Sequence, residues 1–94
     1  GASVHITTGA RLLSEYRPDL GDVVVMNDPD LACRGLVAEF PDTEVFWGAY
    51  LGTPDQVLAN GPLRTVTDDL AALRSRLVDH HGWIQDTYLL RPVP

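Results

Sequence analysis

Two short polar segments of the sequence carry side chains that could bind a metal ion or a phosphate. The segment Asn27–Asp30 follows one apolar run, and the segment Thr53–Asp55 follows another. Carboxylate oxygens are the ligands that a hard cation such as Mg²⁺ prefers, and a helix beginning at each segment favours an anion. If both segments lie at one edge of a sheet, Asp28, Asp30 and Asp55 are the candidate metal ligands.

Helix capping is the interpretation of Asp28, Thr53 and Asp55 that we favour over a metal site. Asp28 and Thr53 stand where the N-caps of two helices would lie, and Pro29 and Pro54 follow them in the sequence. A capping side chain accepts hydrogen bonds from the free amides of the first turn, and proline fits that turn. Capping explains these residues without any ligand. Asp30 is the carboxylate that capping needs least.

The elements that would position these residues are two strands and the segment between them. Asp22–Met26 contains three consecutive valines, and Glu44–Leu51 is apolar on both of its faces. Runs of this kind are typical of central strands that are covered on both faces. Leu31–Phe40 carries apolar residues at roughly helical spacing. Two buried strands joined by a helix predict a parallel β-α-β unit over 21–51, in which the carboxyl ends of both strands share an edge.

The remaining segments complete the predicted domain. The patterns predict a short strand over 4–7, helices over 10–16, 53–59 and 65–81, and an edge strand over 83–91. The fold class that we predict is α/β, with three or four strands, in one domain over residues 4–94. An α+β fold with a mostly antiparallel sheet is the alternative, and the helix over 31–40 distinguishes the two. We expect Gly1–Ser3 to be a remnant of cloning.

Composition excludes several classes of protein. The net charge is −6, and all seven basic residues are arginine. This balance argues against binding nucleic acid through a basic face. No apolar run is long enough to span a bilayer, and the first residues do not have the pattern of a signal peptide. One cysteine rules out an internal disulfide. We expect a cytoplasmic protein without a membrane partner.

Other reactive side chains do not form a convincing catalytic set. Cys33 would lie early in the predicted helix, but Leu31 and Leu36 flank it on the apolar side, which indicates a buried structural thiol. His80 and His81 are adjacent, and we expect them to end the long helix. Neither G-x-G-x-x-G nor a Walker sequence is present. We therefore predict no bound cofactor and no catalytic residue.

Small size, acidity and the missing catalytic set predict a protein-interaction module without catalytic activity. It would be a regulator, an inhibitor or immunity protein, or an accessory protein of a phage or mobile element. Its partner would be another protein or a second copy, paired through the edge strand over 83–90, since unpaired strand edges recruit partners. Trp83 and Tyr88 are the predicted interaction residues. Two alternatives are a small phosphate- or Mg²⁺-dependent enzyme that uses the carboxylates above, and an acidic mimic of nucleic acid.

Overall fold

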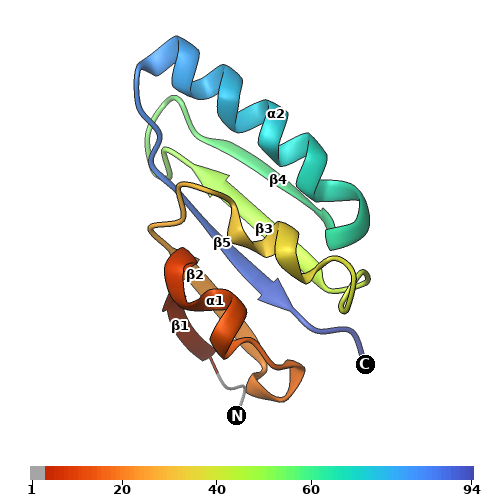
Figure 1. The fold of residues 1–94 in the computed structure, drawn as a ribbon. Coiled ribbons are helices and arrows are strands. Elements are labelled where there is room, and N and C mark those ends of the chain that lie inside the picture. Colours follow the sequence, from red (N-terminus) through yellow and green to blue (C-terminus); the bar gives the residue numbers. More distant parts are fainter. Residues whose placement is uncertain (1–3) are drawn as a thin grey trace.

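The computed structural model describes residues 4–94, and the predicted cloning remnant Gly1–Ser3 lies outside the described residues. Five strands form one mixed sheet in the order β1-β2-β5-β3-β4 (Figure 1). Only the pair β1 and β2 is parallel, and the other neighbours are antiparallel. The strands are β1 (Val4–Thr8), β2 (Asp22–Met26), β3 (Glu44–Ala49), β4 (Val57–Pro62) and β5 (Asp86–Arg91).

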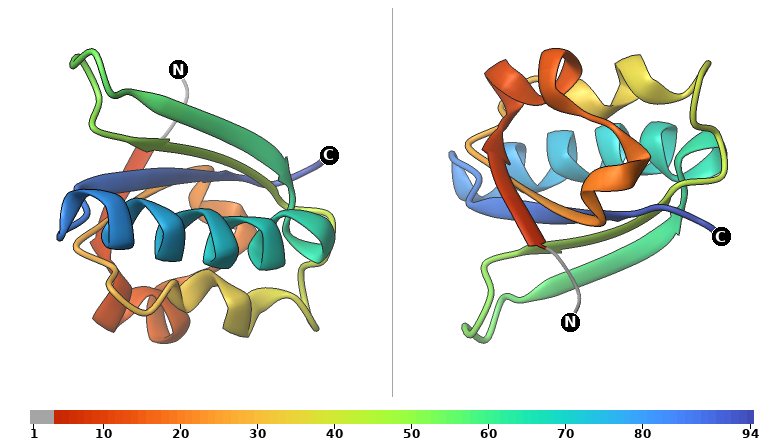
Figure 2. Two further views of the ribbon diagram at one scale, coloured as in Figure 1. Left: turned by 90° about the horizontal axis from the view of Figure 1, so that it is seen from above. Right: turned by 90° about the horizontal axis from the view of Figure 1, so that it is seen from below.

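All helical segments cover the same face of this sheet. Figure 2 shows α1, α2 and the segment before β3 on one side of the strands, with the other side bare. The segments are α1 (Gly9–Glu15), the 3₁₀ helices η1 (Pro18–Leu20) and η2 (Ala32–Leu36), and α2 (Leu63–His81). The end of α2 agrees with the sequence prediction, because Gly82 has the left-handed φ of 79° that stops a helix.

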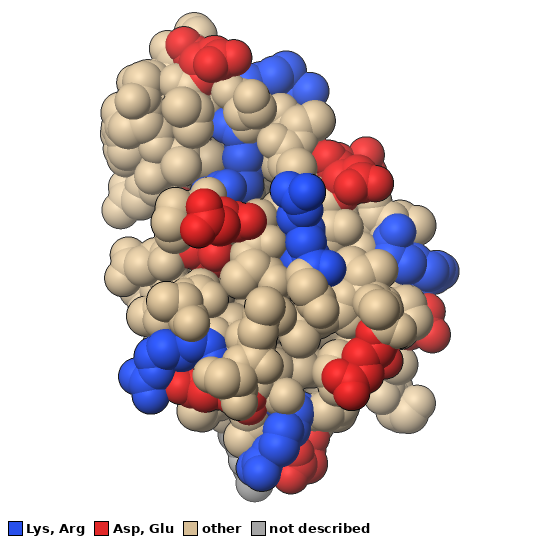
Figure 3. Space-filling model, in the orientation of Figure 1, with Lys and Arg blue, Asp and Glu red and all other residues tan. Residues whose placement is uncertain are grey.

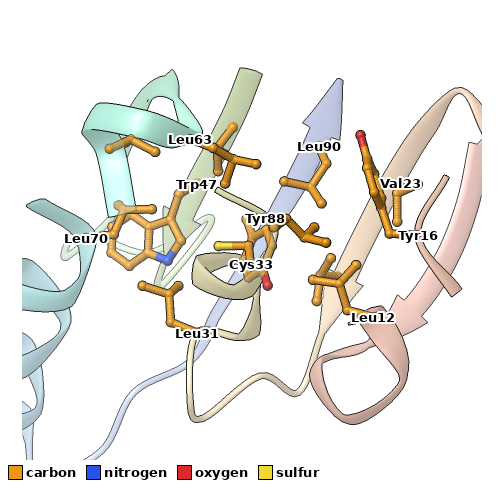
Figure 4. Close-up of a cluster of buried hydrophobic side chains, with 14 of the residues drawn as sticks. Leu12, Tyr16, Val23, Leu31, Cys33, Trp47, Leu63, Leu70, Tyr88 and Leu90 are labelled. Carbon is orange, nitrogen blue, oxygen red and sulfur yellow. The ribbon is translucent and has the colours of Figure 1, made fainter. Parts of the chain in front are cut away.

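The core lies between the sheet and the helices. Alternate residues of the three central strands point toward the helices, as the two-residue period of a strand requires. They meet leucines of α1 and α2 (Figure 4). Burying each such leucine contributes about 1.5–3 kcal/mol. The buried residues at this interface include Val23, Val25, Val45, Trp47, Tyr88, Leu90, Leu12, Leu63 and Leu70.

The predicted α/β fold is wrong, and the α+β alternative with a mostly antiparallel sheet fits the structure better. The sheet has five strands rather than three or four, and β5 lies between β2 and β3. The segment 31–40 is not an α-helix and forms only η2 and turns. Leu31 adopts a left-handed φ of 52°, which interrupts any helix begun at Asp28. Without that crossover helix, β2 and β3 do not pair directly.

The prediction that the last strand lies at an edge of the sheet is also wrong. β5 occupies the centre of the sheet and is paired on both sides, with β2 and with β3. Its backbone donors and acceptors are therefore used, so a homodimer cannot form through this strand. The polar residues that suggested an edge, Asp86 and Thr87, bond to other parts of the chain instead.

A third correction concerns the segment after β3. The helix predicted over 53–59 is absent, and Val57–Pro62 forms β4, which makes an antiparallel hairpin with β3. Thr53 does not cap a helix here, because its hydroxyl donates to the Tyr50 carbonyl within the hairpin turn, at 2.6 Å. Among residues 4–94, no helix is long and apolar enough to cross a membrane.

Candidate functional site at one end of the sheet

The end of the sheet at which β2 and β3 finish is the candidate functional site. Both strands run antiparallel to β5, so they point in the same direction although they are not neighbours. Thr87, near the start of β5, is the register partner of both Met26 and Gly48. The shared edge expected for the two carboxyl ends therefore exists, but β5 separates the strands.

Two hollows lie at this end, one on each side of a short polar rim. The rim consists of Asn27, Gln85 and Asp86, which line both hollows. One hollow has a volume of about 230 Å³ and opens on the bare face of the sheet. The other has a volume of about 320 Å³ and reaches Arg74 on α2.

The backbone at this end contains unusual conformations. Asn27 has a φ of 54° and Tyr50 a φ of 52°, both in the left-handed region that non-glycine residues seldom adopt. Asparagine tolerates this region, whereas a tyrosine there costs on the order of 1 kcal/mol or more. Strained residues of this kind gather at functional sites because the surrounding structure must hold them in place.

The rim residue Asp86 forms a buried ion pair with Arg74 of α2. The Arg74 Nε donates to Asp86 Oδ2 at 2.7 Å, and the two side chains are only 11% and 9% exposed. Trp47 Nε1 donates to the same carboxylate oxygen at 2.8 Å. The two other guanidinium nitrogens donate to the backbone carbonyls of Pro29, at 3.0 Å, and Asp28, at 2.9 Å. One arginine thus connects α2, the sheet and the loop after β2.

Asp28 points into the core rather than into a ligand site. Its Oδ2 accepts a short hydrogen bond from the Tyr88 hydroxyl and another from the Ala32 amide at 2.8 Å. Gly9 makes room for this carboxylate, because a β-carbon at that position would overlap it. Asp28 therefore does cap a turn, as the capping interpretation proposed, but the turn leads into η2 and not into an α-helix.

Cys33 lies beside this buried carboxylate. Burial is the main cause that raises the pKa of the Cys33 thiol to about 11, and the charge of Asp28 acts in the same direction. Burial likewise raises the pKa of Tyr88 far above its usual range. Both groups are protonated at neutral pH. Cys33 is therefore a poor nucleophile, consistent with the structural thiol expected from the sequence.

The raised thiol pKa predicts a loss of stability at alkaline pH. An unfolded cysteine ionises near pH 8.5, so between about pH 8.5 and 11 the unfolded chain releases a proton that the folded chain retains. The free energy of unfolding should therefore fall by about 2–3 kcal/mol as the pH rises across this window. Urea denaturation at pH 8, 9 and 10 measures the fall.

The control for this prediction is Cys33→Ala. The variant lacks the titrating thiol, so its stability should change less between pH 8 and 10, before Tyr88 contributes. Equal slopes for the variant and the parent chain would show that Cys33 is not the group responsible.

The predicted metal ligands do not come together. Asp30 and Asp55 are exposed, and Asp55 lies in the turn between β3 and β4, where its amide donates to Thr53 Oγ1 at 3.2 Å. Within residues 4–94, no group of three histidine, cysteine, aspartate or glutamate side chains could hold a metal ion. Magnesium binding by Asp28, Asp30 and Asp55 stays a prediction that this geometry does not support.

The two predicted interaction residues have different environments. Trp83 is 55% exposed, and its carbonyl accepts a hydrogen bond from the Tyr50 hydroxyl at 2.6 Å. Tyr88 is only 3% exposed, because it is the core residue that bonds Asp28. Of this pair, only Trp83 is presented at the surface.

On the face that Figure 3 displays, the charged side chains do not form the continuous acidic surface that a nucleic-acid mimic needs. Figure 3 shows basic and acidic side chains interspersed over the face that it displays. Five of the seven arginines pair with a carboxylate, which neutralises much of the local field; they are Arg11, Arg17, Arg64, Arg74 and Arg91.

Comparison with known proteins gives the strongest functional information. No protein-family model matches the chain. The chain is 40% identical over 91 residues to a precorrin-6A synthase [deacetylating] from a Sinorhizobium species. It spans about a third of that protein. The match covers 97% of this chain and 34% of the relative.

The fold is also similar to that of a solved structure. The crystal structure of a putative cobalamin synthesis related protein (CobF) from Corynebacterium diphtheriae superposes with a TM-score of 0.90 at 39% identity. The superposition covers 100% of this chain and 39% of that one. Both similarities therefore extend over nearly all of this chain and over a minor part of the longer proteins.

These similarities overturn the prediction of a non-catalytic interaction module. Both related proteins carry names from cobalamin synthesis, one of them the name of an enzyme. Neither alternative, the phosphate- or Mg²⁺-dependent enzyme or the acidic mimic, anticipated that class. The similarity was found by aligning 91 residues, and no motif recognised in the sequence pointed to it.

Proposed function

We propose that this chain is a part of a precorrin-6A synthase of the deacetylating type, acting in cobalamin synthesis. The supporting observation is the 40% identity maintained over 91 of the 94 residues. The TM-score of 0.90 to CobF adds that the same residues adopt the same fold. Proteins with the same fold can have different functions, so the sequence identity supports the proposal more strongly than the shared fold does.

The experiment is to test the longer polypeptide that carries this segment. In a strain that lacks precorrin-6A synthase, its expression should restore cobalamin production. The purified protein should form precorrin-6A, seen by its mass, and should release acetate. A folded full-length protein that does neither, in an assay where the Sinorhizobium enzyme is active, would overturn the proposal.

Within that enzyme, we propose that two of the rim residues, Asn27 and Gln85, face the reaction site. The left-handed backbone at Asn27 and the two hollows beside the rim support this placement. Removing either side chain should lower kcat/KM about five- to tenfold, which corresponds to one lost hydrogen bond. Asn27→Gly is preferred to alanine because glycine keeps the left-handed conformation.

The matched control for these two variants is Arg64→Ala. Arg64 lies in the first turn of α2, in an exposed ion pair with Asp42, and it lines neither of the two hollows. Its replacement should leave kcat/KM unchanged. If Asn27→Gly and Gln85→Ala are as active as the Arg64→Ala variant, the rim does not face the reaction site, whatever the enzyme's overall activity.

A further inference from the structure

The face of the sheet opposite the helices carries ordered rows of side chains. The strand registers align one residue from each of the five strands in a row across the sheet. Successive rows on this face are two residues apart along each strand. These positions alternate with the core residues, so they point away from the helices. The central row is Ile6, Val24, Leu89, Phe46 and Asn60, and the row next to the rim is Thr8, Met26, Thr87, Gly48 and Leu58. We call these two rows the open face.

Six of the ten residues of the open face have large apolar side chains, and no other element of residues 4–94 covers them. Ile6 and Leu58 are each 66% exposed, Met26 is 48% exposed and Phe46 is 41% exposed. Leu51 adds to it by folding back over Gly48, where a β-carbon would overlap the leucine side chain. An exposed apolar patch of a few hundred Å² is often functional, and contact with another protein segment is one such function.

A charged row borders the open face on the side away from the rim. Arg91 donates to both carboxylate oxygens of Asp22, at 3.1 and 2.9 Å, and its guanidinium lies 5.4 Å from the centre of the Phe46 ring. Glu44 is the register partner of Arg91. An apolar centre with a polar border is the usual anatomy of a protein interface.

We propose that the open face is the docking surface for the rest of the longer polypeptide. This inference rests on the proposed function, because the chain spans 34% of the precorrin-6A synthase and 39% of the CobF structure. On that basis most of the enzyme lies outside this chain. Because that remainder is longer than this chain, it is the segment that we expect to cover the open face.

The size of the open face favours this occupant over a second copy of the chain. From strand spacing and residue rise, five strands and two rows give a footprint on the order of 300 Å². A stable complex of separate molecules buries about 800 Å² on each partner. A segment of the same polypeptide needs less contact, because the connection between the parts holds it at a high effective concentration.

The experiment measures the reactivity of cysteines placed on the open face of the full-length protein. Ile6→Cys and Leu58→Cys replace the two most exposed apolar residues of the face. Ala72→Cys, on the exposed side of α2, is the control. Each variant is treated with a thiol reagent in buffer and in urea, and labelling at each site is followed by peptide mass spectrometry. We expect the two open-face cysteines to be protected at least about tenfold more than the control.

Each outcome decides the proposal. Protection no greater than that of Ala72→Cys would overturn it. Protection that disappears on dilution, together with a change from dimer to monomer by light scattering, would assign the face to a second copy and also overturn it. Acetate release is measured on the same preparations: release with an unprotected face refutes the docking alone, whereas protection without release refutes only the proposed enzyme activity.

Discussion

Replacing Arg74 with alanine should lower the free energy of unfolding by about 3–5 kcal/mol, the usual cost of removing one partner of a buried ion pair. The change leaves the Asp86 carboxylate, only 9% exposed, without its counter-charge. It also leaves the carbonyls of Asp28 and Pro29 without their donors. Urea denaturation of the 94-residue chain measures the loss.

Two further variants test why the loss of Arg74 is costly. One removes a different, exposed arginine, and the other keeps the positive charge but changes the geometry of the donors. Arg64→Ala removes an exposed ion pair and should cost less than about 1 kcal/mol. Arg74→Lys keeps the charge but cannot place donors on three acceptors at once, so its stability should lie between those of Arg74→Ala and the parent chain. A loss below about 1 kcal/mol for Arg74→Ala would mean that the pair is not buried in solution.

Replacing Asp28 with alanine should cost about 2–4 kcal/mol, because it leaves buried donors without an acceptor. The Tyr88 hydroxyl and the Ala32 amide both donate to this carboxylate. Tyr88 is only 3% exposed, so water cannot readily replace the lost partner. The same urea measurement applies, at neutral pH.

Asp30→Ala is the matched control, since Asp30 is a neighbouring but exposed carboxylate. Its replacement should change stability by no more than about 0.5 kcal/mol. In the double variant Asp28→Ala with Tyr88→Phe, the orphaned hydroxyl is gone, so the combined loss should be smaller than the sum of the two single losses. Additive losses would show that the two side chains do not bond to each other.

The polar residues of the segment Asn27–Asp30, which follows β2, have different roles in the structure from those expected from the sequence. In the sequence, Asp28 and Asp30 are two carboxylates separated by one proline, and they suggest a shared ligand. In the structure one of them is buried as an acceptor and the other is exposed to solvent. The groups left facing the hollows at the rim are Asn27 and Gln85. Sequence patterns selected Asn27 by its place after a strand, whereas nothing local distinguished Gln85.

Local patterns in the sequence sufficed for several elements. The valine run marked β2, the apolar segment 44–51 contained β3, and the leucine stripe ending at Gly82 marked α2. These elements depend on side-chain period, strand propensity and a stop residue, which are properties of neighbours in the chain. The mostly antiparallel alternative was also within reach, but the sequence ranked it second.

The strand order, the inward turn of Asp28 and the open face arose only from contacts between distant segments. β5 enters between β2 and β3 after about 60 residues of intervening chain, and the Tyr88–Asp28 and Arg74–Asp28 bonds link residues 60 and 46 positions apart. Which strand pairs with which depends on how all the apolar faces are buried together. The neighbours of a residue in the sequence do not determine that choice. Asp28, a candidate ligand in the sequence, is therefore a buried acceptor in the structure, and the strand that was expected at an edge lies at the centre of the sheet.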